Sequence, residues 1–155
     1  MDMERMERVL RRVRGEQPPA EGDDRGELAA LIHAERRSRD SYGKLRARCS
    51  GQCRLLLTQL WTEEEQHLQA LQEQYLLLTG DTLPLGPGGD EPPYTGVVSA
   101  LRHGMEAERR GAEAYRQAAE RTQNRALRQL YEAHAQAETR HAARLEQMLH
   151  RALGK

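Results

Sequence analysis

Apolar residues recur every three or four positions in four long stretches of the chain, which is the spacing of one face of an α-helix. The first stretch, for example, places Leu28, Leu31, Tyr42 and Leu45 on one face. The pattern predicts four amphipathic helices, over residues 24–49, 52–79, 97–121 and 125–153. Leu, Ala, Glu, Gln and Arg dominate and Phe is absent, so the composition argues against an all-β fold.

The breaks between these stretches differ in length. Residues 50–51 and 122–124 are short turns, so the helices on either side of each turn are expected to form an antiparallel hairpin. The segment 80–96 between the hairpins is rich in Pro and Gly and cannot be helical. It could cover ~56 Å at ~3.3 Å per residue, whereas a helix of about 25 residues is ~37 Å long. We therefore predict an all-α fold, an antiparallel four-helix bundle with one long crossover.

The first 22 residues are predicted to stand apart from this bundle, which takes residues 23–155. Residues 2–14 form a short amphipathic stretch. Its apolar residues are Met3, Met6, Val9, Leu10 and Val13. A helix packed on the domain or on a second subunit fits this pattern, and a helix on a membrane surface is the alternative. Residues 15–22 contain Gly and Pro and are predicted to be a linker.

Six ionisable residues interrupt the apolar faces of the predicted helices. They are Glu35, Glu64, His67, Glu108, Glu138 and His141. The neighbouring acidic residues lie off these faces and are interpreted as solvated surface charge. They are Glu63, Glu65, Glu106 and Glu113. An alternative is that the six are also partly exposed surface residues, on helices whose faces have been assigned out of phase.

The interrupting residues repeat in the two halves of the chain. Each half contains a Glu with a Tyr two helical turns later, Glu35 with Tyr42 and Glu108 with Tyr115. A Glu-x-x-His motif comes next in each half, 29 and 30 residues after that Glu. A chain of this composition contains about 0.7 copies of Glu-x-x-His by chance, so the motif alone is weak evidence for a site. The matched spacing and the shared helix face are the stronger evidence. We interpret the chain as an internal duplication of one helical hairpin.

Four carboxylates that face one interior would repel each other and would be costly to desolvate. Two divalent cations balance four carboxylates, and two neutral imidazoles complete the coordination. The Glu and the His of Glu-x-x-His point to the same side of a helix, so one helix can give two ligands to one centre. Oxygen-rich sites with one nitrogen per metal favour iron or manganese. The pattern therefore predicts a site for two metal ions.

The charge balance and the cysteine content argue against several classes of protein. The 24 Lys and Arg residues balance 24 Asp and Glu residues, which gives no support to nucleic-acid binding. No apolar run is long enough for a membrane span, and the charged N-terminus lacks a signal-peptide core, so a cytoplasmic location is expected. Cys49 and Cys53 form C-x-x-x-C, without the paired CxxC motifs of zinc sites. We interpret them as two reduced thiols, with a redox-active pair as the alternative.

On these residues the sequence resembles the ferritin-like superfamily, and within it the di-iron domain of rubrerythrins, over about residues 24–153. That family uses a Glu from each of two helices and a Glu-x-x-His from each of the other two. The resemblance implies a centre of two iron ions, with manganese as the alternative metal. The implied ligands are Glu35, Glu64 and His67 from one half, and Glu108, Glu138 and His141 from the other. By the family pattern, Glu64 and Glu138 bridge the two metals. Tyr42 and Tyr115 lie near the site, where they could supply protons or electrons.

The sequence departs from rubrerythrins in two ways. No rubredoxin-type pair of CxxC motifs follows the bundle, so electrons are expected to come from another protein. Rubrerythrins also carry an extra Glu one turn after the third-helix ligand, and this position is Gly111 here. That Glu supports the metal movement linked to peroxide reduction, so its absence implies inefficient peroxidase activity. The small residue is expected to leave an opening for dioxygen, peroxide or water.

One histidine has no match in the other half of the chain. His134 lies one turn before Glu138 on the same face, where the first half has Leu60. We interpret His134 as a hydrogen-bonded residue, either next to the metal ligands or in the core, and an additional metal ligand is the alternative.

Three functions fit this pattern. A redox enzyme would oxidise Fe(II) and reduce O₂ or hydrogen peroxide, with an external electron donor, and this is the leading hypothesis. A metal-binding or storage protein would hold the ions without turnover. A coat-type interaction protein would keep the site for structural reasons. A homodimer is expected, because ferritin-like bundles often pair through their helical faces.

Overall fold

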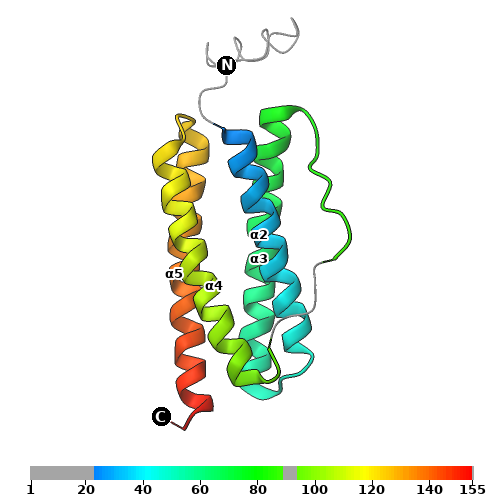
Figure 1. Cartoon of the computed structure of the whole chain (residues 1–155), viewed down its shortest axis with the longest axis vertical. Coiled ribbons are helices and arrows are strands. Elements are labelled where there is room, and N and C mark those ends of the chain that lie inside the picture. The colour runs from blue at the N-terminus through cyan, green and yellow to red at the C-terminus, as the bar shows by residue number, and fades with distance from the viewer. Residues whose placement is uncertain (1–22, 89–93, 155) are drawn as a thin grey trace, which may run out of the picture.

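The computed structural model describes residues 23–88 and 94–154, so the predicted N-terminal amphipathic helix and linker lie outside the described residues. The described part of the chain contains four helices. They are α2 (Asp24–Arg46), α3 (Gly51–Thr79), α4 (Val97–Arg121) and α5 (Arg125–Ala152). They form the predicted all-α four-helix bundle (Figure 1), and each boundary is within three residues of the one expected from the sequence.

Local chemistry explains where the helices begin and end. Asp23 accepts a hydrogen bond of 2.9 Å from a backbone N–H in the first turn of α2. Asn124 accepts two such bonds in the first turn of α5, so both side chains are N-caps. Gly80 ends α3 at φ 82°, a left-handed conformation that favours glycine, and its N–H donates to the carbonyl of Leu76.

The two hairpins are joined by a crossover, residues 80–96, of which residues 80–88 run from the end of α3 back along the bundle (Figure 1). Helix α4 begins at the end of the bundle opposite to the end where α3 stops. Leu83 and Leu85 of the crossover pack against an apolar cluster of the bundle. The guanidinium of Arg36 on α2 donates to the backbone carbonyls of Leu85 and Gly86. This connection places α2 against α4 and α3 against α5, in addition to the contacts within each hairpin.

The core consists of two apolar clusters with a polar layer between them. The first cluster includes Leu28, Leu71, Tyr115, Leu127 and Tyr131. The second cluster includes Tyr42, Leu57, Leu101 and Leu145. Along each helix, buried ionisable residues lie between the part that enters the first cluster and the part that enters the second. The ionisable residues of the four helices therefore meet at one level of the bundle.

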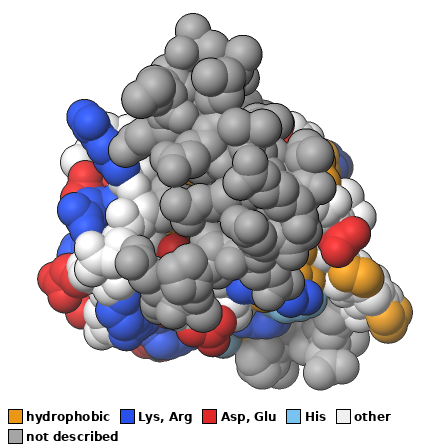
Figure 2. Space-filling view, turned by 90° about the horizontal axis from the view of Figure 1, so that it is seen from above, with side chains coloured by type: hydrophobic (Ala, Val, Ile, Leu, Met, Phe, Trp, Pro, Cys, Tyr) orange, Lys and Arg blue, Asp and Glu red, His pale blue; other side chains and the backbone are white. Residues whose placement is uncertain are grey.

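The outer surface carries charges of both signs. Figure 2 shows basic and acidic side chains side by side along the rim of the described surface, in agreement with the balanced composition. The large apolar side chains that are exposed in the described residues are Leu55, Leu76, Leu77 and Leu153. None of the helices in the described part of the chain is long and apolar enough to cross a membrane.

Candidate metal centre

The six residues that interrupt the apolar faces lie together in the polar layer. Glu35 comes from α2, Glu64 and His67 from α3, Glu108 from α4, and Glu138 and His141 from α5. All except His67 are at most 4% exposed, and the His67 side chain is 12% exposed. The alternative of surface residues on misassigned helix faces is therefore wrong.

The donor atoms of these residues form two groups that share two carboxyl groups. The first group is Glu35, Glu64, His67 and Glu138, and the second is Glu64, Glu108, Glu138 and His141. Within each group, one donor atom from every residue lies within 4.8 Å of the others. Glu64 and Glu138 belong to both groups. They are the two residues to which the family resemblance assigned bridging positions.

Several inner atoms of this layer lack a hydrogen-bond partner among the described residues. Each of the four carboxyl groups has at least one unpaired oxygen, and Glu64 has two: Glu35 Oε2, Glu64 Oε1 and Oε2, Glu108 Oε2 and Glu138 Oε1. An unpaired buried polar group costs ~1–3 kcal/mol, so such groups are rare. His141 Nδ1 lies 2.9 Å from Glu64 Oε1, and His67 Nδ1 lies 3.3 Å from Glu138 Oε1. Oxygens and ring nitrogens that converge in this way fit the donor preferences of divalent cations such as iron and manganese.

The crowding of the carboxyl groups decides which of them keep a proton. Burial, together with the neighbouring Glu35, raises the pKa of Glu64 well above its usual range. Burial, together with Glu108, raises the pKa of Glu138 to about 12. Burial also opposes the charge of Glu35, but Glu64 and His67 outweigh it and lower the pKa of Glu35 to about 2. In the metal-free protein, Glu64 and Glu138 therefore hold protons that a bound cation must displace.

Two buried tyrosines support the outer carboxylates in a reciprocal arrangement. Tyr42 on α2 donates its hydroxyl hydrogen to Glu108 Oε1 on α4, and Tyr115 on α4 donates to Glu35 Oε1 on α2. Burial and these carboxylates raise the pKa of both tyrosines well above the usual range, so both hydroxyls stay protonated. The structure thus places both tyrosines beside the site, and through them it links the two hairpins.

Glu63 was expected to be solvated surface charge, and the structure corrects this expectation. Its Oε2 lies 2.6 Å from His141 Nε2, and its Oε1 accepts a hydrogen bond of 3.0 Å from Arg144. A carboxylate on the outer nitrogen of a histidine fixes the ring and directs its other nitrogen toward a metal. Burial opposes a charge on His141, but Glu108 and Glu63 outweigh burial and raise its pKa.

The other three acidic neighbours are surface residues, as expected. Glu65 pairs with Arg39 at 2.7 Å, Glu113 pairs with Arg116 at 3.0 Å, and Glu106 is exposed. None of the three belongs to the two donor groups. The polar layer and the surface ion pairs are therefore separate features.

His134 is a further buried side chain at the edge of the polar layer. It is 6% exposed, and its ring stacks on that of His67, with 4.2 Å between the centroids. Burial and His67 lower the pKa of His134 to about 4, so the ring is neutral at pH 7. Its Nδ1 has no hydrogen-bond partner in the described part of the chain. The interpretation of His134 as a hydrogen-bonded residue therefore does not hold for this atom.

Gly111 does not leave the expected opening beside the site. A Cβ atom at position 111 would lie 2.8 Å from Glu138 Oε2. The carboxyl group of Glu138 therefore takes the space beside the backbone of α4. A side chain at position 111 would require the carboxyl group of Glu138 to move.

The two cysteines lie outside the polar layer. Cys49 and Cys53 are free thiols that pack against the second apolar cluster. Burial and the adjacent Cys49 raise the pKa of Cys53 to about 12. A thiol that ionises so reluctantly is a poor nucleophile. This favours two packed thiols over a redox-active pair.

Comparison with known proteins agrees with this architecture. A family model described as a ferritin-like domain matches residues 26–151. The chain belongs to this ferritin-like family. Its structure is also similar to the crystal structure of a conserved hypothetical protein from Mycobacterium tuberculosis, with a TM-score of 0.71 and 20% identity over 81% of this chain and 89% of that chain. At this level of identity the likeness shows a shared fold. No curated protein matches the chain.

Loading the ferritin-like bundle with a divalent cation should release protons. Because Glu64 and Glu138 are protonated in the metal-free protein, we expect about two protons per chain when both groups bind Co(II). The apparent affinity for Co(II) should therefore rise between about pH 5 and 8. Calorimetric titration in buffers of different ionisation enthalpy measures the released protons. An affinity that does not change with pH would contradict the assigned protonation.

Glu138→Gln should stabilise the metal-free protein. The pKa of Glu138 is about 12 in the folded state, against 4.5 for an ordinary Glu, so the folded carboxyl group holds a proton that the unfolded chain releases. Wild-type stability therefore falls as the pH rises through this window. Gln mimics the protonated group, so the variant should melt higher at pH 8. The expected increase is roughly 2–4 °C for each kcal/mol gained in the free energy of unfolding. The two melting temperatures should converge near pH 5, as measured by circular dichroism. A variant that melts lower at pH 8 would show that Glu138 is ionised.

Glu63→Gln should weaken metal binding without unfolding the bundle. The variant loses the charged acceptor on His141 Nε2, and loss of such a partner lowers metal affinity by about 10–100-fold. Glu65→Gln is the matched control, because Glu65 is the surface neighbour two positions along. Co(II) affinities from calorimetry would separate the two variants. Equal affinities would reduce Glu63 to a surface charge.

Proposed function

We propose that this ferritin-like protein is a non-haem di-iron protein of the rubrerythrin type, which oxidises Fe(II) and reduces O₂ or hydrogen peroxide with electrons from an external donor. One observation carries the proposal. Each of the two buried donor groups has three carboxyl groups and one imidazole, and both groups share Glu64 and Glu138. Two divalent cations would balance the four carboxylates. Bound iron would supply the electrons that reduce the oxidant.

The residues of the chain hold and orient this centre. Glu64 and Glu138 would contact both ions. The remaining ligands would be Glu35 and His67 for one ion, and Glu108 and His141 for the other. Tyr42 and Tyr115 fix the outer carboxylates by hydrogen bonds that their hydroxyl groups donate beside the site. The apolar clusters on both sides of the layer keep bulk water away from it.

The test is anaerobic loading of the purified protein with Fe(II), followed by desalting and measurement of iron content. Wild type should retain two irons per chain. On exposure to air or peroxide it should then consume the oxidant at least tenfold faster than free Fe(II), with a prompt near-ultraviolet ferric absorption. Glu64→Ala removes a carboxyl group common to both donor groups. It should abolish both iron retention and rapid oxidation.

Glu65→Ala is the matched control for this experiment. Glu65 is adjacent in sequence but pairs with Arg39 at the surface, so this variant should behave as wild type. Loss of iron in both variants would point to general destabilisation. Wild-type protein that retains no iron or manganese would overturn the proposal, and the coat-type interaction protein would become the leading hypothesis.

A metal-binding or storage protein without turnover is the second candidate, and Gly111 favours it. The carboxylate that rubrerythrins carry at this position is missing, and Glu138 takes the space beside it. A centre without this additional carboxylate would hold its metals in fixed positions. Retention of two irons per chain with oxidation no faster than that of free Fe(II) would favour this candidate over the redox enzyme.

A further inference from the structure

A buried imidazole lies next to the first donor group without belonging to the six predicted ligands. His134 is 94% shielded from solvent, and its Nδ1 makes no hydrogen bond within the described residues. An imidazole nitrogen in this position loses its water and gains no partner, which is unfavourable in an apolar interior. A hydrogen bond within the described residues therefore does not explain why a histidine is buried here.

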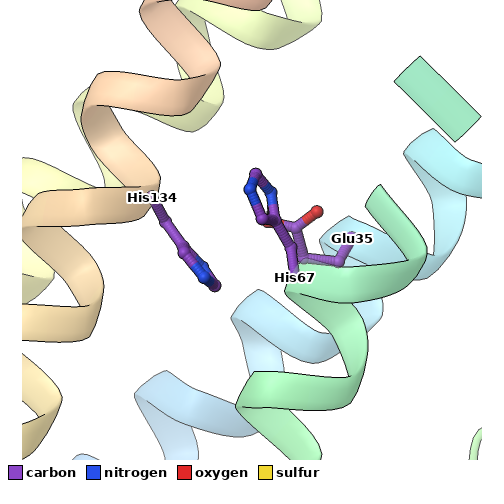
Figure 3. Close-up of side chains that lie close together, drawn as sticks. All are labelled: Glu35, His67 and His134. Carbon is purple, nitrogen blue, oxygen red and sulfur yellow. Dashed lines mark ion pairs between the residues drawn. The ribbon is translucent and has the colours of Figure 1, made fainter. Parts of the chain in front are cut away.

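The side chain of His134 converges with two residues of the first donor group. Figure 3 shows His134 approaching from α5, with Glu35 on α2 and His67 on α3 across from it. One donor atom from each of these three residues lies within 4.8 Å of the other two. Two ligands on opposite sides of one metal ion are about 4.2 Å apart, since each bond is about 2.1 Å. A small side-chain movement would bring the three donors to one ion.

Packing alone does not account for an imidazole at this place. The equivalent position in the first half of the chain is Leu60, which is fully buried in the second apolar cluster. Tyr115 contacts the His134 ring edge-on at 5.1 Å between centroids, but its hydroxyl hydrogen is donated to Glu35. A leucine or phenylalanine would fill the space without burying ring nitrogens. The ring nitrogens of His134 therefore need a role other than packing.

We propose that His134 is a third histidine ligand, which binds the same metal ion as Glu35 and His67. The proposal rests on the metal centre of the proposed function. It makes the two metal positions unequal, because one has two imidazoles and the other has His141 alone. A neutral imidazole adds no charge but takes a coordination position. The position beside Glu108 and His141 is then the one with fewer protein donors, and small molecules have more room to bind there.

The test compares wild type with His134→Leu, which copies Leu60, in titrations with Co(II). Wild type should bind two Co(II) ions per chain. In the variant, one of the two ions should bind at least tenfold more weakly, and the visible absorption of that equivalent should change, because it reports the ligands of Co(II). The second ion should keep the wild-type affinity and spectrum.

Stability gives an independent reading of the same variant. Removal of an unpaired buried nitrogen should leave the melting temperature of the metal-free protein unchanged or higher. The increase in melting temperature on addition of Co(II) should be smaller than in wild type, because the stabilisation by a bound ligand grows with the logarithm of its affinity. His134→Phe keeps the aromatic stacking on His67 without a donor atom, and it should repeat the weaker binding if the Leu variant folds poorly.

His150→Leu is the control on the same helix, because His150 is exposed. It should bind both Co(II) ions as wild type does. The inference is overturned if a folded His134→Leu or His134→Phe protein binds two Co(II) ions with wild-type affinity and spectrum, since His134 would then serve packing only. If wild type binds fewer than two Co(II) ions, the two-metal centre itself is wrong, and the role of His134 is rejected with it.

Discussion

The burial of four carboxyl groups at one level of a helical bundle is the constraint on which the rest of this structure depends. A buried carboxylate needs a cation, a proton or hydrogen-bond donors to offset the loss of water. The chain supplies protons on Glu64 and Glu138 and tyrosine hydroxyls to Glu35 and Glu108. In the ion pairs of the described residues, these carboxyl groups meet histidines and neither Lys nor Arg. A Lys or Arg side chain would take the place of a cation here, so the described contacts leave these carboxyl groups available to a metal.

The apolar clusters offset the free-energy cost of burying such a layer. Each fully buried Leu contributes roughly 1.5–3 kcal/mol, and several of them lie on each side of the polar layer. The stabilising contacts are thus separated from the groups that resist burial. The crossover matters for the same reason, because it brings α2 against α4 and lets Tyr42 and Tyr115 reach the carboxylate of the opposite hairpin.

Periodicity alone was sufficient to predict the helices and the six buried ionisable residues, because both depend on spacing along one helix face. What it could not show was any contact between helices. Glu63 lies off the apolar face of α3, and its role appears only when α5 brings His141 and Arg144 beside it. The expectation of an opening at Gly111 was wrong for a related reason, since the atom that fills this space belongs to Glu138 on another helix. A turn-by-turn comparison of the two halves did single out His134, because Leu60 occupies the matching position.

The duplication predicts two equivalent halves, and the structure departs from equivalence at both imidazoles. His141 has a carboxylate on its outer nitrogen, from Glu63, where the other half has Ala137. His67 has instead a neutral ring stacked against it, from His134. An outer carboxylate makes an imidazole a stronger electron donor, whereas a stacked neutral ring does not. Two metal ions held by these groups would therefore differ in affinity and in potential. The two halves therefore differ at the residues that contact His141 and His67. This difference makes the two ends of the centre unequal, whereas a symmetric pair of hairpins would make them equal.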